Sequence, residues 1–375
     1  MTGAPQALPV ALLLPGQGSQ HRRMAAGLYG HEPVFTEAMD EFFDAAGPEG
    51  GPLRDDWLAE RPATDIDHVT RSQPLLFAVD HALGRLVLGR GVRPAALLGH
   101  SIGELAAATL AGVFAPRDAA GLVLDRIRRL SAAPPGGMLA VAASTAEVAP
   151  YLRGDVVVGA VNAPRQTVLA GPDGPLDEVD RALREAGFVC RRVPSLSAFH
   201  SPVLEPACRG AAPLFAAARK HPPAVPVHSA YTAAPLTESD IGDPAFWARQ
   251  PVAPVLFWPA LEGLLATGDH LLVEVGPGQG LSQLVRRHPA VRRGSSAVVS
   301  LLPARPGPPE ADRAAVAAAA ERITAAGRPA GSASADRGRP SRPGAAGGAA
   351  GEYGGPSPGN VRGGGSGEGG GGGEG

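Results

Sequence analysis

The stretch Gly99-His100-Ser101-Ile102-Gly103 follows an apolar run at residues 94–98 and precedes a helical pattern at residues 104–111. It fits Gly-x-Ser-x-Gly, the sharp turn that holds a nucleophilic serine between a strand and a helix. Small neighbours let the turn close, and N–H groups at the helix start can stabilise an oxyanion. Such a match also arises by chance in a glycine-rich chain, but its setting makes Ser101 a candidate nucleophile.

Two other apolar runs also end in glycine-rich turns. Residues 10–14 lead into Pro15-Gly16, and residues 270–275 lead into Gly276-Pro277-Gly278. Runs that are apolar on both faces indicate parallel strands covered by helices. Active sites of such sheets lie beyond the carboxyl ends of the strands. The sequence therefore predicts an α/β fold whose site lies where these runs end.

The middle of the chain follows a different pattern of short elements. Strands are expected at 138–143, 156–161, 167–170 and 188–193, and helices at 145–153 and 176–186. This order is βαββαβ, the ferredoxin-like unit. We therefore predict a large α/β-hydrolase-like domain with a parallel sheet at 8–133 and 197–326, interrupted by a small ferredoxin-like domain at 134–196.

The composition changes near residue 327. Residues 311–326 are alanine-rich and predict a last helix, whereas residues 327–375 contain 20 glycines and almost no aliphatic side chains. Such a segment buries too little apolar surface to offset the entropy of ordering it. We predict a disordered tail at 327–375.

Charge and cysteine content narrow the class of protein. The formal net charge is −2, so a general nucleic-acid binder is not expected. Residues 8–14 are too short to span a bilayer, and the N-terminus lacks a secretory signal. Cys190 and Cys208 have no metal-binding spacing and are expected to be free thiols, with a disulfide left open. We expect a cytoplasmic protein that binds neither nucleic acid nor membrane.

A serine nucleophile needs a base, and the chain has ten histidines. His100 is adjacent to Ser101, but neighbouring side chains on such a turn generally point apart. His200 follows the last strand of the predicted small domain, where the chain re-enters the large one. Composition alone does not choose between His200 and the others.

Four segments, taken in order, resemble one family. They are Pro15-Gly-Gln-Gly-Ser-Gln20, Gly99-His-Ser-Ile-Gly-Glu104, Phe199-His-Ser-Pro202 and Val273-Glu-Val-Gly-Pro-Gly278. Together they resemble the malonyl-CoA:acyl-carrier-protein transacylases of fatty-acid synthesis and the acyltransferase domains of polyketide synthases. The resemblance runs from about residue 12 to residue 302.

The resemblance implies a catalytic role for four residues. Ser101 matches the family's nucleophile, and His200 matches its general base, which a backbone carbonyl orients. The N–H groups of Gln17 and Ile102 match the two donors of the oxyanion hole. No catalytic aspartate is expected.

The resemblance also implies substrate-binding residues. Arg126 lies 25 residues after the serine and matches an arginine that holds the free carboxylate of a malonyl-type unit; a solvated basic helix face is the alternative. Gln73, Gln250 and His100 match polar positions near the pocket. Phe199 in Ser197-Ala-Phe-His200 resembles the malonyl pattern His-Ala-Phe-His, although Ser197 departs from its first position.

The implied reaction is ping-pong. Malonyl-CoA acylates Ser101, and the phosphopantetheine thiol of an acyl carrier protein then takes the acyl unit, with no metal or redox cofactor. Fatty-acid and polyketide synthesis both stay open, with the segment around Phe199 favouring the latter. We expect a free-standing, monomeric enzyme, and Arg191 and Arg192 are candidate contacts for an acidic carrier.

Four alternatives remain at this point. A methylmalonyl-specific acyltransferase would share the whole site. An editing hydrolase would share Ser101 and His200 but would be expected to lack Arg126. A degenerate docking module would not be acylated. An unrelated esterase would place an acid and a histidine late in the chain.

Overall fold

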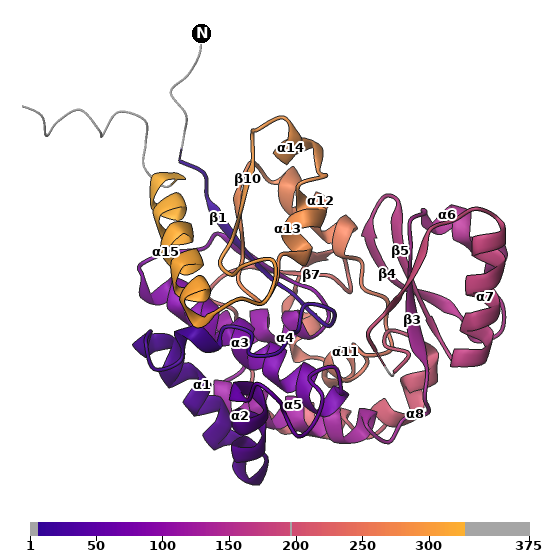
Figure 1. Ribbon diagram of the computed structural model, residues 1–375, viewed down its shortest axis with the longest axis horizontal. Helices are drawn as coiled ribbons and strands as arrows, with labels where there is room; N and C mark the ends of the chain where they lie inside the picture. Colours follow the sequence, from indigo (N-terminus) through magenta and orange to yellow (C-terminus); the bar gives the residue numbers. More distant parts are fainter. Residues whose placement is uncertain (1–6, 196, 327–375) are drawn as a thin grey trace, which may run out of the picture. The chain divides into compact units, whose positions relative to one another are not determined.

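The computed structural model describes residues 7–195 and 197–326. The predicted tail at 327–375 lies outside the described residues. Two β-sheets organise the described part, and Figure 1 shows the smaller sheet beside the main body. Because the serine turn belongs to the larger sheet, that sheet is considered first.

The larger sheet has the strand order β10-β9-β1-β2-β7-β8. Its strands are β1 (Val10–Leu14), β2 (Ala96–Gly99), β7 (Val227–Ser229), β8 (Ala234–Pro235), β9 (Leu271–Glu274) and β10 (Ala297–Ser300). All neighbours pair in parallel except β7 and β8, so an antiparallel edge strand joins the expected parallel sheet. Every residue of β1, β2 and β9 is buried, as expected for strands covered on both faces.

Helices cover both faces of this sheet. The chain moves from β1 to β2 and β7 in one direction, and from β9 to β10 in the other. Because parallel crossovers are right-handed, the helices of the two directions lie on opposite faces. Figure 1 shows α3 and α4 apart from α12 and α13 in this way. The carboxyl ends of β1, β2 and β9 therefore meet at the point where the winding reverses.

The helices of the N-terminal half are η1 (Ala26–Leu28), α1 (Pro33–Ala45), η2 (Gly47–Glu49), α2 (Gly50–Leu58), α3 (Val69–Gly89), α4 (Ile102–Leu110) and α5 (Pro116–Leu130). Those after the small sheet are η4 (Pro202–Leu204), α8 (Glu205–Cys208), α9 (Ala212–Ala217), α10 (Glu238–Gly242), α11 (Pro244–Ala248), α12 (Phe257–Ala266), α13 (Gly280–Val285), α14 (Pro289–Arg292) and α15 (Pro309–Ala326). The predicted last helix corresponds to α15.

The smaller sheet has the ferredoxin-like order β4-β5-β3-β6, and all its neighbours are antiparallel. Its elements are β3 (Gly137–Val141), α6 (Thr145–Val148), η3 (Ala149–Tyr151), β4 (Val157–Ala163), β5 (Gln166–Gly171), α7 (Asp173–Glu185) and β6 (Cys190–Val193). In α7, Leu176, Val179 and Leu183 face a separate apolar core with the sheet. The predicted fold class is confirmed, whereas the domain boundaries at 133/134 and 196/197 stay predictions.

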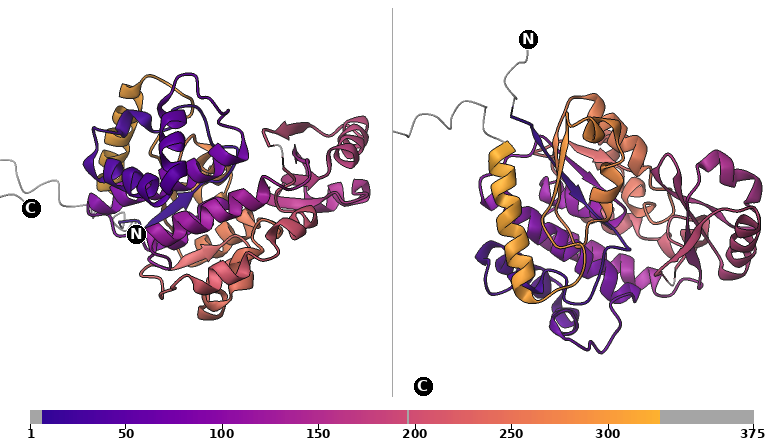
Figure 2. Two further views of the ribbon diagram at one scale, coloured as in Figure 1. Left: turned by 90° about the horizontal axis from the view of Figure 1, so that it is seen from below. Right: turned by 45° about the horizontal axis from the view of Figure 1, so that its top comes forward.

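A short segment near residue 255 joins the two sheets. The N–H of Val255 donates to the carbonyl of Gly159 at 2.9 Å, and the N–H of Val161 donates to the carbonyl of Val255 at 2.8 Å. This bridge fixes β4 against the large body, beside α12. Both views in Figure 2 show the smaller sheet attached along one side of the main body.

Some sequence expectations concern other features of the described residues. Cys190 and Cys208 are both free and buried. No group of histidine, cysteine or acidic side chains within the described ranges could hold a metal ion. The helices of the described part are all too short or too polar to cross a membrane.

Candidate active site

The turn after β2 holds Ser101 in an uncommon backbone conformation. Its φ is 56° and its ψ is −120°, outside the regions that L-residues prefer. Such strain costs of order 1–3 kcal/mol and persists only where the surroundings enforce it. The turn raises the hydroxyl above the sheet, directly before the first residue of α4.

Two glycines make this turn possible by close approach. A Cβ atom on Gly99 would lie 2.2 Å from the nitrogen of Glu104, and one on Gly103 would lie 2.2 Å from the carbonyl oxygen of Leu14. Both atoms are main-chain atoms that cannot swing aside. The glycine positions of the motif are therefore steric requirements, as the sequence pattern predicts.

The structure brings Ser101 and His200 together. Oγ of Ser101 lies 2.8 Å from Nε2 of His200, and both residues are buried. Nδ1 of His200 donates to the carbonyls of Ala253 at 2.9 Å and Gln250 at 3.2 Å. Since carbonyls only accept, the ring proton sits on Nδ1 and Nε2 accepts from the serine hydroxyl. This is the geometry of a nucleophile with its general base.

The surroundings of His200 keep its imidazole neutral. Burial is the main cause that lowers its pKa to about 4; the nearby His100 and Arg126 act in the same direction, while the two carbonyls oppose the shift. The imidazole is therefore neutral at physiological pH and can take up a proton without first losing one. Its backbone φ of 64° is, like that of Ser101, in a strained region.

The N–H groups of Gln17 and Ile102 are the two predicted donors of the oxyanion hole. Gln17 follows the end of β1, and Ile102 is the first residue of α4. Among the described residues, neither N–H has a hydrogen-bond acceptor. The side chain of Gln73 on α3 donates from Nε2 to Oε1 of Gln17 at 2.6 Å, and Gln73 is 2% exposed. Gln73 thus holds the Gln17 loop in place instead of facing the cavity.

The ring of His100 contacts the smaller sheet. Its Nε2 lies 2.9 Å from Oδ1 of Asn162 at the end of β4. Burial lowers the pKa of His100. A neutral ring that donates to an amide oxygen is therefore held beside the nucleophile, and the contact joins the serine turn to the smaller sheet.

Arg126 on α5 is buried in a polar network behind the serine. Its Nη2 donates to the carbonyl of Trp247 and to Oε1 of Gln250, each at 3.2 Å. In the described part of the chain, its Nη1 and Nε have no hydrogen-bond partner. Burial lowers the pKa of this guanidinium, while Tyr231 and Glu104 raise it. The role of Arg126 as the carboxylate-binding residue stays a prediction.

A cavity of about 490 Å³ opens at the serine. Ser101, His200, Gln17, His100 and Phe199 line it, whereas Arg126, Gln73 and Gln250 are not among its lining residues. Other lining residues come from both sheets and include Gly16, Met138, Ala140, Ala160, Asn162, Val168, Val193 and Leu284. The cavity therefore lies between the end of the larger sheet and one face of the smaller sheet.

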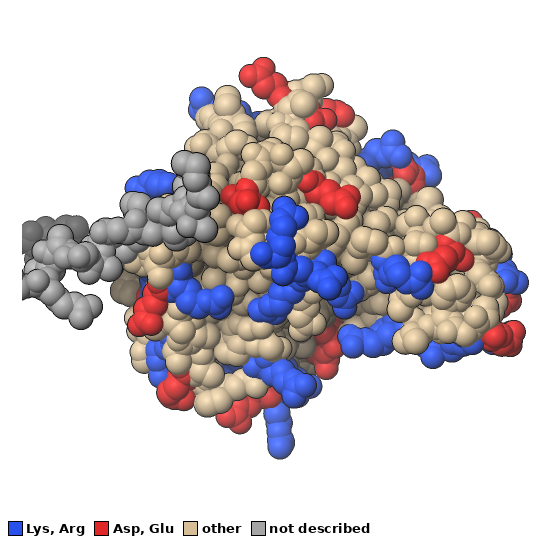
Figure 3. All heavy atoms as spheres, turned by 90° about the horizontal axis from the view of Figure 1, so that it is seen from above, with Lys and Arg blue, Asp and Glu red and all other residues tan. Residues whose placement is uncertain are grey.

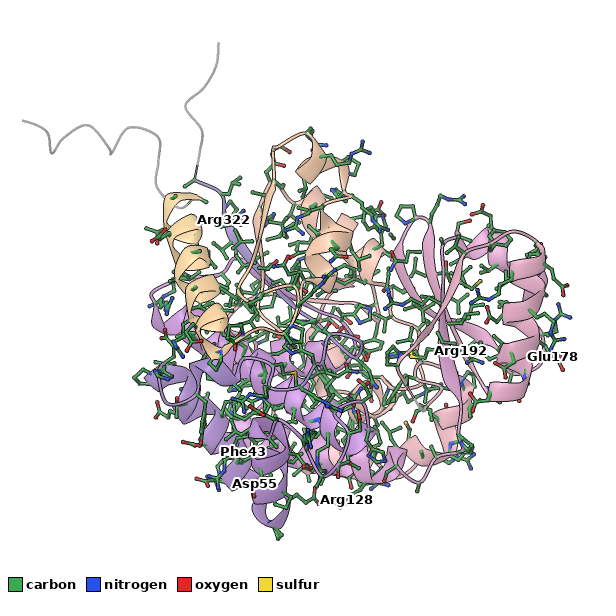
Figure 4. The ribbon with its side chains drawn as sticks, viewed as in Figure 1. Phe43, Asp55, Arg128, Glu178, Arg192 and Arg322 are labelled. Carbon is green, nitrogen blue, oxygen red and sulfur yellow. The ribbon has the colours of Figure 1, made fainter. Side chains whose placement is uncertain are left out.

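Arginines surround this cavity unevenly. Arg165, Arg191 and Arg287 line it. Arg192 instead turns to α7, where it pairs with Asp177 and lies 3.9 Å from Asp173; Figure 4 labels it on the smaller sheet. Figure 3, which views the molecule from above relative to Figure 1, shows acidic and basic groups interspersed. Several Lys and Arg side chains lie near the middle of the face in view. Of the two suggested carrier contacts, only Arg191 faces the cavity.

Sequence reasoning missed three residues at the site. Asn162 pairs with His100, the ring of Tyr231 lies 6.1 Å from that of His200, and Ala253 orients the base by its carbonyl. In the sequence, the only signal at Asn162 is that of a turn between two strands. A carbonyl gives no side-chain signal, so Ala253 cannot be found from the sequence.

The geometry agrees with comparisons to known proteins. A family model described as the acyl transferase domain matches residues 12–311. The chain belongs to the acyl transferase domain family. The resemblance expected from the sequence motifs is thereby confirmed.

Individual members of the family support this assignment. The chain is 40% identical over 286 residues to a phenolphthiocerol/phthiocerol polyketide synthase protein of Mycobacterium tuberculosis, covering 76% of this chain and 19% of that protein. The acyl transferase domain of SpnD, solved with 2-(pent-4-yn-1-yl)malonyl, has a TM-score of 0.80 at 31% identity, with coverage of 87% and 79%. The malonyl CoA-acyl carrier protein transacylase of Coxiella burnetii has a TM-score of 0.74 at 25% identity, with coverage of 86% and 100%.

These comparisons define the class of protein. The chain spans about a fifth of the length of the mycobacterial polyketide synthase protein that it matches. It has the fold of polyketide synthase acyltransferase domains and of the bacterial transacylase. The acyltransferase family is thus established, while acyl unit and acceptor are separate questions.

Proposed function

We propose that the protein transfers a malonyl unit from coenzyme A to the phosphopantetheine thiol of an acyl carrier protein, through an ester on Ser101. The observation that carries the proposal is the 2.8 Å contact between Oγ of Ser101 and Nε2 of His200, close to the buried fork of Arg126. Relatives that include polyketide synthases and a malonyl transacylase support it.

The first half-reaction loads the serine. His200 takes the proton of the Ser101 hydroxyl as its oxygen attacks the thioester carbonyl. The N–H groups of Gln17 and Ile102 stabilise the oxyanion, and one such donor is worth roughly 3–4 kcal/mol. When the intermediate collapses, the sulfur of coenzyme A leaves and takes the proton from His200.

The second half-reaction unloads the serine. The phosphopantetheine thiol of the carrier gives its proton to His200 and attacks the ester, and His200 then protonates the leaving Ser101 oxygen. This chemistry requires neither a metal nor a redox cofactor. Arg165, Arg191 and Arg287 on the cavity wall suit the phosphates of coenzyme A or an acidic carrier.

Acyl selection follows from charge and size. The free edge of Arg126 can hold a carboxylate by two hydrogen bonds, which favours dicarboxylic units. Phe199 is 4% exposed and lines the cavity, so its ring occupies space that an α-methyl group would need. One methyl group changes selectivity by only about 1–3 kcal/mol, so malonyl is preferred over methylmalonyl without absolute exclusion.

Intact-protein mass spectrometry tests the proposal. The protein and Ser101→Ala are incubated in parallel with malonyl-CoA, methylmalonyl-CoA and acetyl-CoA, and a carrier protein is then added. The expected result is a malonyl adduct that needs Ser101 and moves to the carrier. Rapid hydrolysis of the adduct with no transfer indicates an editing hydrolase, a larger methylmalonyl adduct indicates the other extender, and no adduct contradicts acyl transfer.

A further inference from the structure

A buried carboxyl group, linked to Arg126 through Gln250, has no part in the chemistry above. Glu104 is on the first turn of α4, three residues after the nucleophile, and has no exposed surface. Its Oε1 accepts from the hydroxyl of Ser229 at 2.7 Å, and its Oε2 accepts from the N–H of Ala230 at 2.8 Å. A carboxyl group whose partners all donate is arranged as an anion.

The amide of Gln250 links this carboxyl group to the guanidinium. Its Oε1 accepts from Nη2 of Arg126 at 3.2 Å, and its Nε2 donates to Oε1 of Glu104 at 3.4 Å. The amide is thus oriented with its oxygen toward the cation and its N–H toward the acid. This is the orientation that a charged Arg126 and a charged Glu104 both favour.

On the proposed function, a malonyl carboxylate would be a second anion beside the same cation. We propose that Glu104 and the substrate carboxylate compete for the charge of Arg126, so that loading a dicarboxylic acyl unit on Ser101 is accompanied by uptake of a proton at Glu104. The ionised form of Glu104 then opposes loading, and its neutral form permits it.

The surroundings of Glu104 place its titration in an accessible range. Burial raises its pKa to about 8, while Ser229, Ala230 and Arg126 oppose this shift. Asp240 on α10 acts in the same direction as burial, and half-buried Tyr231 faces both Glu104 and Arg126. A new anion at Arg126 removes part of the stabilisation of the Glu104 carboxylate. The pKa of Glu104 therefore rises further, and Glu104 takes up a proton.

The proton balance of the loading step isolates this effect. The serine hydroxyl loses a proton and the coenzyme A sulfur gains one, so no net proton is exchanged through His200. Above neutral pH the released coenzyme A thiol itself loses part of a proton, which a titration of free coenzyme A measures separately. Any remaining uptake belongs to the protein.

The experiment follows proton uptake in weakly buffered solution with a pH indicator during a single turnover with malonyl-CoA. Mass spectrometry counts the acyl-enzyme formed. Corrected uptake is the proton uptake after allowance for ionisation of the released coenzyme A thiol. It is expected to grow from about pH 7 to about pH 9, toward about one proton per acyl-enzyme. Glu104→Gln is expected to abolish it, and Glu274→Gln, which removes another buried carboxyl group away from Arg126, should leave it unchanged.

The outcomes separate the two proposals. Acyl-enzyme that forms with no corrected uptake at any pH, or with equal uptake in Glu104→Gln, would overturn the role of Glu104. Absence of acyl-enzyme would instead contradict the proposed function. If Glu104→Gln does not fold, the pH dependence of uptake in the unchanged protein decides alone, because uptake that stays at zero excludes the coupling.

Discussion

Nε2 of His100 lies 2.9 Å from Oδ1 of Asn162, so a hydrogen bond links the residue before the nucleophile to the smaller sheet. Asn162→Ala is expected to leave His100 free to rotate within the cavity beside Ser101. A neutral hydrogen bond contributes about 1 kcal/mol, so the rate of acyl-enzyme formation should fall about fivefold. Rapid-quench kinetics measure this rate. An unchanged rate at unchanged thermal stability would show that the contact does not position His100.

The close approach at the serine turn predicts opposite effects of two glycine substitutions. Gly99→Ala places a Cβ atom 2.2 Å from the Glu104 nitrogen and should cost at least about 3 kcal/mol of unfolding free energy. Gly121→Ala is the matched control, because Gly121 lies within α5 with no neighbouring atom within 4 Å of an added Cβ. It should stabilise the helix by about 0.5–1 kcal/mol. Denaturant titration compares both, and similar effects would contradict the steric argument.

The pKa of His200 predicts how loading depends on acidity. The base must be neutral, and burial lowers its pKa to about 4, so the competent form predominates above that pH and is lost below it. The rate of acyl-enzyme formation should therefore stay level from about pH 7 down to about pH 5 and then fall. Single-turnover kinetics across this range provide the measurement. An inflection near the ordinary histidine pKa of about 6.5 would mean that the ring is more solvated than the structure indicates.

Removal of the buried cation predicts a selective loss. Arg126→Ala removes charge-assisted hydrogen bonds worth about 1.5–3 kcal/mol each, so kcat/KM for malonyl-CoA should fall about 10- to 100-fold or more. Arg126→Lys retains the charge without the planar fork and should recover only part of the loss. The rate at which acetyl-CoA loads Ser101 should not fall in these variants, because acetyl-CoA has no free carboxylate. An equal loss for both substrates would indicate a structural role.

The ring of Phe199 predicts a change of selectivity. Phe199→Ala opens space in the cavity beside Ser101, so the ratio of kcat/KM for methylmalonyl-CoA to that for malonyl-CoA should rise about tenfold. Competition between the two substrates, read by the mass of the adduct, measures this ratio directly. A ratio that does not change would place the methyl group elsewhere in the cavity.

Much of the fold could be predicted because its elements have local signals. The runs that form β1, β2 and β9 are apolar on both faces, and α7 has an apolar stripe at helical spacing. The short strands β7 and β8 carry no such pattern. Their pairing depends on the larger sheet beside them, which local reasoning does not contain.

The site also combines residues that have a local sequence signal with contacts that depend on the assembled fold. Ser101 could be nominated from its motif, and Arg126 from the family resemblance, because each belongs to a continuous element. The partnership of His100 with Asn162 spans 62 residues and depends on how β4 packs. Arg126 and Gln250 could be nominated singly, but their link to Glu104 appears only once α4, α5 and the segment after α11 are assembled.

Gln250 contacts two site residues through different groups. Its carbonyl oxygen orients His200, whereas its side-chain amide contacts Arg126. A substitution at this position changes the side-chain amide but keeps the main-chain carbonyl. The other acceptor for His200, the carbonyl of Ala253, is also a main-chain group. If Arg126 binds the acyl carboxylate as proposed, a substitution here can change the surroundings of Arg126 while the carbonyl that orients the base is retained. On that proposal, acyl selection and orientation of the base depend on different atoms of a single residue.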